Sequence, residues 1–436
     1  MLIFLSNLLK QAEFYLQPTP VKPKNMEMRG IRVRENMICW GEYVTLYFAH
    51  KRPGKFSERH LKYFREQQEK HGKRVFYYNA PKGASPVSPE WNYFGMEWHC
   101  SPPRLGEYMR DAQTPNRAAR NMYLSTFACL NSKDFFDYKL DSIGGFLQNP
   151  EYKVRDLYFD LTWPRPCANP VHGCQWTDEF GYRHRDGDLK QLRLLLKRLY
   201  IQMKQKDATA LFCGHTISTR LPSDVFFDSL LVGELYDRHI LNGPSYYNVL
   251  TPDLMRIAYA SRNIEMEVSL IPQFERALQL FAPDRYAKLN PAEPEMDRAI
   301  CHFLGYMLVH DLGSRPTTKN NARMKEFYAA RDRIAGRSGA YTFHPYWEEK
   351  NSPVKPSFFG KYCMVSCFSN PGRLTIAALN DSDKTETFEL SVDTARFGLK
   401  KDITGMELIS NRKVVVKNGK LTSVIGPRGL RIFVFD

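Results

Sequence analysis

The sequence lacks an apolar run near the ~20 residues that a membrane-spanning helix needs, which excludes a membrane span. Its apolar opening, residues 1–9, has neither a basic region nor a small-residue cleavage site, so we do not interpret it as a signal peptide. The chain begins only a few residues before its first predicted strand. We therefore predict the later part of a longer product, periplasmic or extracellular if that product is exported.

Acidic residues are the scarcer charge: 47 Asp and Glu stand against 62 Lys and Arg, giving a net charge of +15. The sequence has no block of consecutive basic residues and no helix-turn-helix or finger pattern, which argues against nucleic acid as the partner. An anionic polysaccharide suits the same charge. The nine Cys are an odd number without a dense framework, so disulfides are neither implied nor excluded.

The 436 residues are enough for one large domain and one smaller domain. Short apolar runs alternate with helical patterns over the first part of the chain, which predicts parallel strands joined by helices. We predict a (β/α)8 TIM barrel over residues 1–345, with an insertion at about 81–150. An antiparallel all-β sandwich is predicted over residues 350–436.

Eight barrel strands are predicted, and residues 35–43 are predicted to be irregular. The strands are 13–17, 44–50, 74–79, 157–159, 208–213, 229–232, 265–271 and 306–310. The clearest helix is 188–206, where Leu and Met recur every three or four residues. Other helices are predicted at 57–71, 115–130, 134–148, 251–262, 294–306 and 321–335. In the C-terminal part, Asn418-Gly419 predicts a two-residue hairpin turn.

Polar residues follow five of the predicted barrel strands. They are Asp160, His215, Glu234, Gln273 and Asp311. Because parallel barrel strands end at one rim, these side chains are expected together. Glycoside hydrolysis needs such a pair of carboxyl groups, one to protonate the leaving oxygen and one to attack or to activate water.

Each candidate also has a purely structural interpretation. Asp160 could cap a turn, Glu234 could form a buried ion pair with an Arg, and His215 could be a hydrogen-bonded loop residue. Asp228 precedes its strand and should lie at the opposite, stabilising end of the barrel.

The loop after Asp160 carries Cys167, His172 and Cys174, which could supply three zinc ligands. A fourth ligand is missing and the spacing is not a standard zinc signature. A Cys167–Cys174 disulfide or two buried thiols is therefore the preferred interpretation, and no metal or cofactor is predicted. Trp163 and Trp176 could form a wall that stacks on sugar rings, or could pack the loop.

Several motifs resemble an uncharacterised bacterial family that is described as glycoside-hydrolase-like. They are Gln17–Lys22, Glu35–Asn36, Trp40–Tyr43, Tyr158–Asp160, Cys167–Trp176 and Gly233–Tyr236. The resemblance covers about residues 13–436 and implies a (β/α)8 catalytic domain followed by a β-sandwich. The family's N-terminal β-domain has no counterpart in this sequence.

A more distant resemblance to α-galactosidase-like hydrolases implies residue roles. It makes Asp160, after the fourth strand, the nucleophile, and Glu234, after the sixth, the acid/base. Those enzymes commonly have Asp at the second position.

We therefore predict a glycosidase that acts on a complex glycan, with an anionic one suiting the charge. The expected partner is a carbohydrate. The predicted substrate contacts are His215, Trp163, Trp176, His172, Tyr236, Gln273, Asp311, Lys22 and Glu42. The alternatives are a carbohydrate-binding protein without turnover, and a metal-dependent hydrolase that uses Cys167, His172 and Cys174.

Overall fold

The structure is a computed structural model of the chain. It describes residues 37–40, 62, 65–66, 68–70, 74–84, 89–101, 126–150, 155–216, 223–236, 249–262, 266–271, 283–288, 294–314, 321–335, 341–348, 350–358 and 363–436. The predicted strands 13–17 and 44–50 lie outside these residues, as does most of the predicted helix 57–71.

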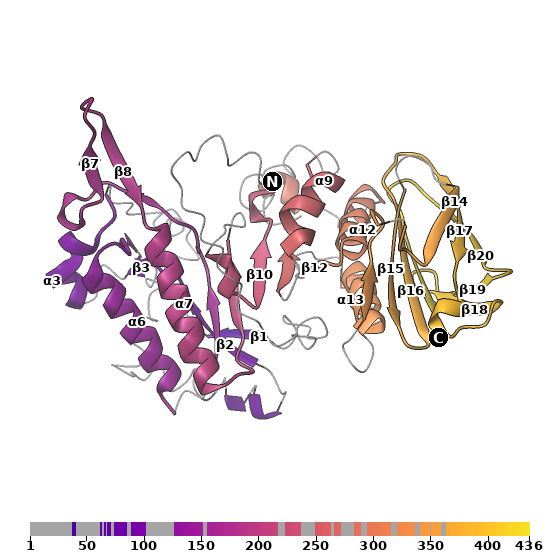
Figure 1. Ribbon diagram of the computed structural model, residues 1–436, viewed down its shortest axis with the longest axis horizontal. Helices are drawn as coiled ribbons and strands as arrows, with labels where there is room; N and C mark the ends of the chain where they lie inside the picture. The colour runs from indigo at the N-terminus through magenta and orange to yellow at the C-terminus, as the bar shows by residue number, and fades with distance from the viewer. Residues whose placement is uncertain are drawn as a thin grey trace.

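The first domain is a TIM-barrel-like α/β unit built on a parallel sheet (Figure 1). Seven strands are described, in the order β1-β2-β5-β9-β10-β11-β12, and every neighbouring pair is parallel. They are β1 (Met37–Trp40), β2 (Arg74–Asn79), β5 (Asp156–Phe159), β9 (Phe212–His215), β10 (Ser229–Val232), β11 (Glu267–Leu270) and β12 (Gly313–Ser314). All four residues of β5, β9 and β10 are buried, as apolar runs in a parallel sheet should be.

Several predicted strands are confirmed and others are shifted. β2, β5, β10 and β11 match their predictions to within two residues. The prediction of an irregular 35–43 was wrong over Met37–Trp40, which pairs with β2. β9 begins four residues later than predicted, because residues 208–209 form a turn, and it includes His215.

The predicted strand 306–310 was wrong. These residues complete the helix α12 (Pro294–Val309), and the strand at the sheet edge is β12. A short apolar run cannot distinguish a strand from a buried helix, and 11 of the 16 residues of α12 are buried. Asp311, with φ 55°, lies between the helix and the strand.

Two long helices cover one flank of the parallel sheet and lie side by side (Figure 1). They are α6 (Lys133–Gln148) and α7 (Leu189–Lys206). Ser132 caps α6 by accepting a hydrogen bond from the backbone of Phe135, as the N-terminus of a helix requires. α7 buries the apolar stripe that the sequence predicts, including Leu192, Leu199 and Met203.

Smaller elements extend the loops of this domain. Before α6 come β3 (Gly83–Ala84), α3 (Pro89–Trp98) and β4 (Thr126–Phe127), so the predicted helix 115–130 was wrong over 126–127. After β5 come β6 (Pro166–Cys167), the 3-10 turn η2 (Pro170–His172), β7 (Gln175–Thr177) and β8 (Arg183–Gly187). The β7–β8 hairpin projects from the body of the domain (Figure 1).

Further helical segments follow in the second half of the domain. They are η3 (Asp224–Phe226), η4 (Glu234–Tyr236), α9 (Pro252–Leu254), the π-helix η5 (Met255–Tyr259), η6 (Ala260–Arg262), α11 (Pro283–Ala287) and α13 (Asn321–Ala335). No helix among the residues described above combines the length and the apolar character that crossing a bilayer would require.

The second domain consists of two antiparallel sheets, as predicted. One has the order β13-β15-β16-β21-β18-β19 and the other the order β14-β17-β20. The strands are β13 (Thr342–His344), β14 (Val354–Phe358), β15 (Cys363–Asn370), β16 (Arg373–Asn380), β17 (Glu386–Val392), β18 (Ile403–Glu407), β19 (Arg412–Val416), β20 (Lys420–Ile425) and β21 (Leu430–Phe435), with the short turn η7 (Ala395–Phe397).

The predicted turn at Asn418-Gly419 is confirmed, with φ of 52° and 73° at its two central residues. Two backbone hydrogen bonds between Lys417 and Lys420 close it. The turn joins β19 of the larger sheet to β20 of the smaller one, so it links the two layers rather than two strands of one sheet.

α12 lies between the parallel sheet and the β-domain (Figure 1). One continuous apolar cluster includes Ile300 and Leu308 from this helix together with Leu379 and Ile432 from the β-domain. Burying this shared surface holds the two domains together.

Candidate functional site

Three polar residues gather at the carboxyl ends of three adjacent strands. Asp160 follows β5, His215 is the last residue of β9, and Glu234 opens η4 two residues after β10. Because the sheet order is β5-β9-β10, His215 lies between the two carboxylates. The sequence predicted this meeting from the geometry of parallel strands alone.

Asp160 is held firmly in place. Its Oδ1 accepts a hydrogen bond from the Leu161 backbone N–H at 2.7 Å and lies 2.9 Å from His215 Nδ1, and its Oδ2 accepts a hydrogen bond from the Tyr78 hydroxyl. Leu161 has φ 58°, a left-handed conformation that Leu rarely adopts. Asp160 is only 7% exposed, so these donors replace the water that would otherwise solvate its charge.

His215 connects Asp160 to Glu234. Its Nε2 lies 3.4 Å from Glu234 Oε2, while Nδ1 contacts Asp160. The backbone carbonyl of His215 accepts hydrogen bonds from the Thr162 backbone N–H at 3.2 Å and from the Thr162 hydroxyl at 3.0 Å. The imidazole therefore bridges the two carboxyl groups, with one ring nitrogen facing each of them.

Glu234 is the more accessible of the two carboxylates, with 29% of its side chain exposed against 10% for Asp160. Two residues on, Tyr236 turns into the core, where its hydroxyl contacts the Tyr259 hydroxyl at 2.6 Å. Burial raises the pKa of Tyr236. Its environment is therefore that of a packed core residue rather than of a substrate contact.

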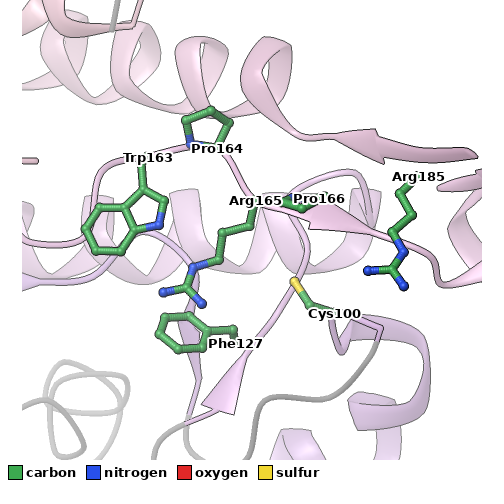
Figure 2. A pocket seen from close by; sticks show the side chains of 7 residues that line it. All are labelled: Cys100, Phe127, Trp163, Pro164, Arg165, Pro166 and Arg185. Carbon is green, nitrogen blue, oxygen red and sulfur yellow. The ribbon is translucent and has the colours of Figure 1, made fainter. Parts of the chain in front are cut away.

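Trp163 lines a pocket of about 170 Å³ beside the loop that follows Asp160 (Figure 2). The lining residues are Cys100, Phe127, Trp163, Pro164, Arg165, Pro166 and Arg185. The Arg165 guanidinium lies 3.7 Å from the centre of the Phe127 ring and 5.3 Å from that of Trp163. Two guanidinium groups and two aromatic rings form walls that suit an anionic ring-shaped ligand.

A buried ion pair holds the backbone of two residues that line this pocket. Lys82 Nζ lies 2.7 Å from Asp188 Oδ1, which also accepts the Arg165 backbone N–H at 3.0 Å. Lys82 donates as well to the Trp163 carbonyl at 2.6 Å. Burial lowers the pKa of Lys82, and Asp188 partly offsets this shift. The pair thus fixes the backbone on both sides of Pro164.

A second buried lysine lies near the end of β2. Lys139 of α6 donates to Asn79 Oδ1 at 2.9 Å and to the Gly83 carbonyl at 3.0 Å. Burial lowers the pKa of Lys139 well below its usual value. The Asn79 carbonyl in turn accepts the Asp160 backbone N–H at 2.8 Å, so α6 helps to position the end of β5.

Other predicted contacts lie away from the carboxylates. Trp176 is 53% exposed on the β7–β8 hairpin and stacks on His184 at 4.2 Å. His172 contacts sulfur atoms instead, as described below. Gln273, Lys22 and Glu42 lie outside the described residues.

Asp311 was expected at the same rim, and the structure does not place it there. It precedes β12 rather than following a strand, so it lies towards the amino end of the sheet. Its Oδ1 accepts hydrogen bonds from Arg331 Nη1 and from the Tyr341 hydroxyl, both at 2.7 Å. The geometric reason for expecting Asp311 to contact substrate is therefore gone. Asp228 is structural as expected: it is 1% exposed and accepts the backbone N–H of Phe212 at 2.8 Å.

A cluster of sulfur atoms lies beside the pocket. Cys129, Cys167, His172 and Cys174 bring their ligand atoms within 4.8 Å of one another. No disulfide joins the eight cysteines whose side chains the structure describes. Of the two forms predicted for Cys167 and Cys174, the structure therefore has the two buried thiols and not the disulfide. Hydrogen bonds from Cys100 and Cys129 lower the pKa of Cys167.

Sequence reasoning missed several residues of these sites. Tyr78 carries no signal beyond its position one residue before the end of a strand. Cys100 and Cys129 are separated from the Cys167–Cys174 loop by tens of residues, so no spacing motif connects them. Only the folded chain brings them together.

Comparison with solved structures supports the fold assignment. The chain is similar to an Anoxybacillus α-amylase, with 11% identity, a TM-score of 0.52, and coverage of 86% of this chain and 78% of that one. It is similar to the Geobacillus thermoleovorans α-amylase solved with acarbose, with 10% identity, a TM-score of 0.51, and coverage of 86% and 80%.

A maltogenic α-amylase from Thermotoga neapolitana gives 11% identity, a TM-score of 0.50, and coverage of 94% and 93%. These glycoside hydrolases share the barrel and the β-domain, and at such identities the likeness establishes the fold alone. No protein-family model matches the chain, and no curated protein matches it in sequence.

Proposed function

We propose that this protein hydrolyses glycosidic bonds in a complex glycan, with Asp160 as nucleophile and Glu234 as acid/base. The observation that carries the proposal is the linked set Asp160–His215–Glu234 at one rim of the barrel. The hydrogen-bond donors around Asp160 favour its ionised form, which a nucleophile needs. The more exposed Glu234 is able to reach a leaving-group oxygen.

His215 contacts both members of the proposed catalytic pair, which have different roles. A nucleophile must stay charged while its partner delivers a proton and later recovers it from water. An imidazole in contact with both carboxylates can hold them in orientation, while Glu234 gives its proton to the leaving oxygen in the first step and regains one from water in the second. The fold of the amylases named above, in which a barrel precedes a β-domain, is compatible with such chemistry.

An anionic glycan suits the proposed activity best. The net charge is +15, and Arg165 and Arg185 line the pocket next to Trp163. Guanidinium groups bind carboxylates and sulfates through paired hydrogen bonds, and an indole ring stacks on a sugar. A charged saccharide could therefore place one unit in this pocket.

The experiment is hydrolysis of a panel of neutral, uronate-containing and sulfated glycans by the full chain, with product analysis. We expect release of reducing ends from at least one anionic glycan. NMR of the first product should show retained anomeric configuration, because the proposed nucleophile forms a covalent intermediate. Binding of a glycan without any hydrolysis would replace this proposal with the carbohydrate-binding alternative.

A further inference from the structure

Four ligand-type side chains converge beside the pocket, one from the segment before α6 and three from the loop after β5. Cys129 follows β4, Cys167 ends β6, His172 ends η2, and Cys174 lies just before β7. The sulfur atoms of Cys129 and Cys174 are 3.7 Å apart. A tetrahedral zinc ion with Zn–S bonds of about 2.3 Å holds two sulfurs about 3.8 Å apart. A disulfide would bring them to about 2 Å.

The sulfurs are surrounded by donors that suit thiolates. Cys167 Sγ accepts the backbone N–H groups of Ser101 at 3.3 Å and of Asn169 at 3.4 Å. Cys174 Sγ accepts from Asn131 Nδ2 at 3.0 Å. Hydrogen bonds of this kind orient metal-bound thiolates and spread their charge.

The histidine is oriented in the same way. His172 Nδ1 lies 3.1 Å from Cys174 Sγ, while its Nε2 lies 3.5 Å from the His99 carbonyl oxygen and 3.9 Å from Cys167 Sγ. A metal-binding imidazole usually gives the N–H of its second nitrogen to a carbonyl or carboxylate. Nδ1, the nitrogen nearer to a sulfur, is therefore the one we assign to the metal, with Nε2 left to donate to the His99 carbonyl.

We propose that Cys129, Cys167, His172 and Cys174 bind one structural zinc ion. Cys129, Cys167 and Cys174 are fully buried, so four protein ligands close the coordination sphere and leave no position for a substrate. The ion joins the segment before α6 to the loop that carries Trp163 and Arg165. The role of this ion is to fix the pocket wall. It has no catalytic role, unlike the metal ion of the metal-dependent hydrolase that the sequence suggested as an alternative.

Cys100 is the matched control for this ligand set. It is buried and hydrogen-bonded to Cys129 and Cys167, yet it is outside the group of four. A second control is Cys363, a thiol of the β-domain. Replacing either with Ser removes a sulfur but leaves the proposed ligands intact.

The experiment is metal analysis of the full chain purified under reducing conditions from zinc-supplemented cells. We expect one zinc per chain in the wild type and in Cys100→Ser and Cys363→Ser. We expect near-complete loss of zinc in Cys174→Ser and His172→Ala. Cobalt substitution should give the visible bands of a tetrahedral site with thiolate ligands.

The proposal does not depend on glycosidase activity. If the variants fail to fold, it can still be tested by measurements on the wild-type protein. In that case the cobalt spectrum of the wild type, and a lower melting temperature after zinc chelation, support it. Wild-type protein without bound zinc that does not take up cobalt would overturn it. So would a Cys129–Cys174 disulfide found by mass spectrometry, or zinc retained by His172→Ala and lost by Cys100→Ser.

Discussion

At the scale of single residues, the site depends on how Asp160 is solvated by the protein. The carboxylate is nearly buried, and three donors from Tyr78, Leu161 and His215 surround it. A hydrogen bond to a charged group contributes about 1.5–3 kcal/mol, so the loss of one donor to Asp160 should be measurable.

The first prediction concerns the hydroxyl of Tyr78. In Tyr78→Phe, kcat on the glycan found by the panel should fall about 10- to 100-fold, since one donor to the nucleophile is lost. KM should change little, because the ring and its stacking on Tyr158 at 5.0 Å remain. Tyr182→Phe, on the exposed β7–β8 hairpin, is the control. Equal kcat values in Tyr78→Phe and wild type would mean that the Tyr78 bond to Asp160 has no catalytic role.

At the scale of elements, the end of β9 determines where His215 stands. Gly214 precedes it in the strand, and a Cβ there would lie 2.5 Å from the Phe227 ring. Only a residue without a side chain lets the ring pack this closely. Gly187 of β8 offers a matched comparison, because a Cβ at that position would meet no atom within 4 Å.

The second prediction is that Gly214→Ala lowers the free energy of unfolding by about 1–3 kcal/mol, the usual cost of overpacking a core. Urea unfolding measures this change. Gly187→Ala should stay within about 0.5 kcal/mol of wild type, as surface changes do. A wild-type stability for Gly214→Ala would show that Phe227 moves freely and does not fix β9.

Some helices and strands could be predicted from the sequence and others could not. β5, β10 and α7 were predictable, because an uninterrupted apolar run and a stripe at helical spacing are local signals. Residues 306–310 were not, because their apolar run continues a helix that is buried on most sides between the parallel sheet and the β-domain. The rim position of Asp160 followed from its place after a strand, whereas the cysteine cluster depends on contacts between distant segments.

At the scale of the whole molecule, the two domains meet through α12 and its histidines. His310, at the end of α12, contacts the Tyr306 carbonyl at 2.8 Å and the Tyr346 hydroxyl at 3.2 Å. His302 pairs with Asp381 of the β-domain at 2.7 Å. Burial lowers the pKa of both, that of His310 to about 4.

The third prediction follows from His310. The unfolded chain binds its proton near pH 6.5 and the folded chain only near pH 4, so this histidine's stabilising effect is complete above pH 6.5. It is lost as the pH falls towards 4, by about 3 kcal/mol in total. Urea unfolding at a series of pH values should therefore show a shallower pH dependence for His310→Gln than for wild type.

The control for that series is Tyr182→Phe, on the exposed β7–β8 hairpin, which removes no group that titrates between pH 6.5 and 4 and should keep the wild-type slope. Part of the slope should persist in His310→Gln, because His302 is also buried. Identical slopes for His310→Gln and wild type would mean that His310 is not kept neutral by the junction.

The fourth prediction concerns the net charge of +15. If an anionic glycan is the substrate, kcat/KM should fall as ionic strength rises from about 0.01 to 0.15 M, because salt screens the attraction. kcat at saturating glycan should hardly change. Initial rates at several salt concentrations measure both, and a kcat/KM independent of salt would argue for a neutral substrate.

The most direct test of the proposed mechanism is the rate of glycan hydrolysis by Asp160→Asn and Glu234→Gln. Asp186→Asn and Glu179→Gln, exposed on the β7–β8 hairpin, make the same chemical changes as controls. We expect each site variant to lose at least about a hundredfold in kcat while it still binds glycan, and the controls to match wild type. Hydrolysis at the wild-type rate by either site variant would contradict the mechanism.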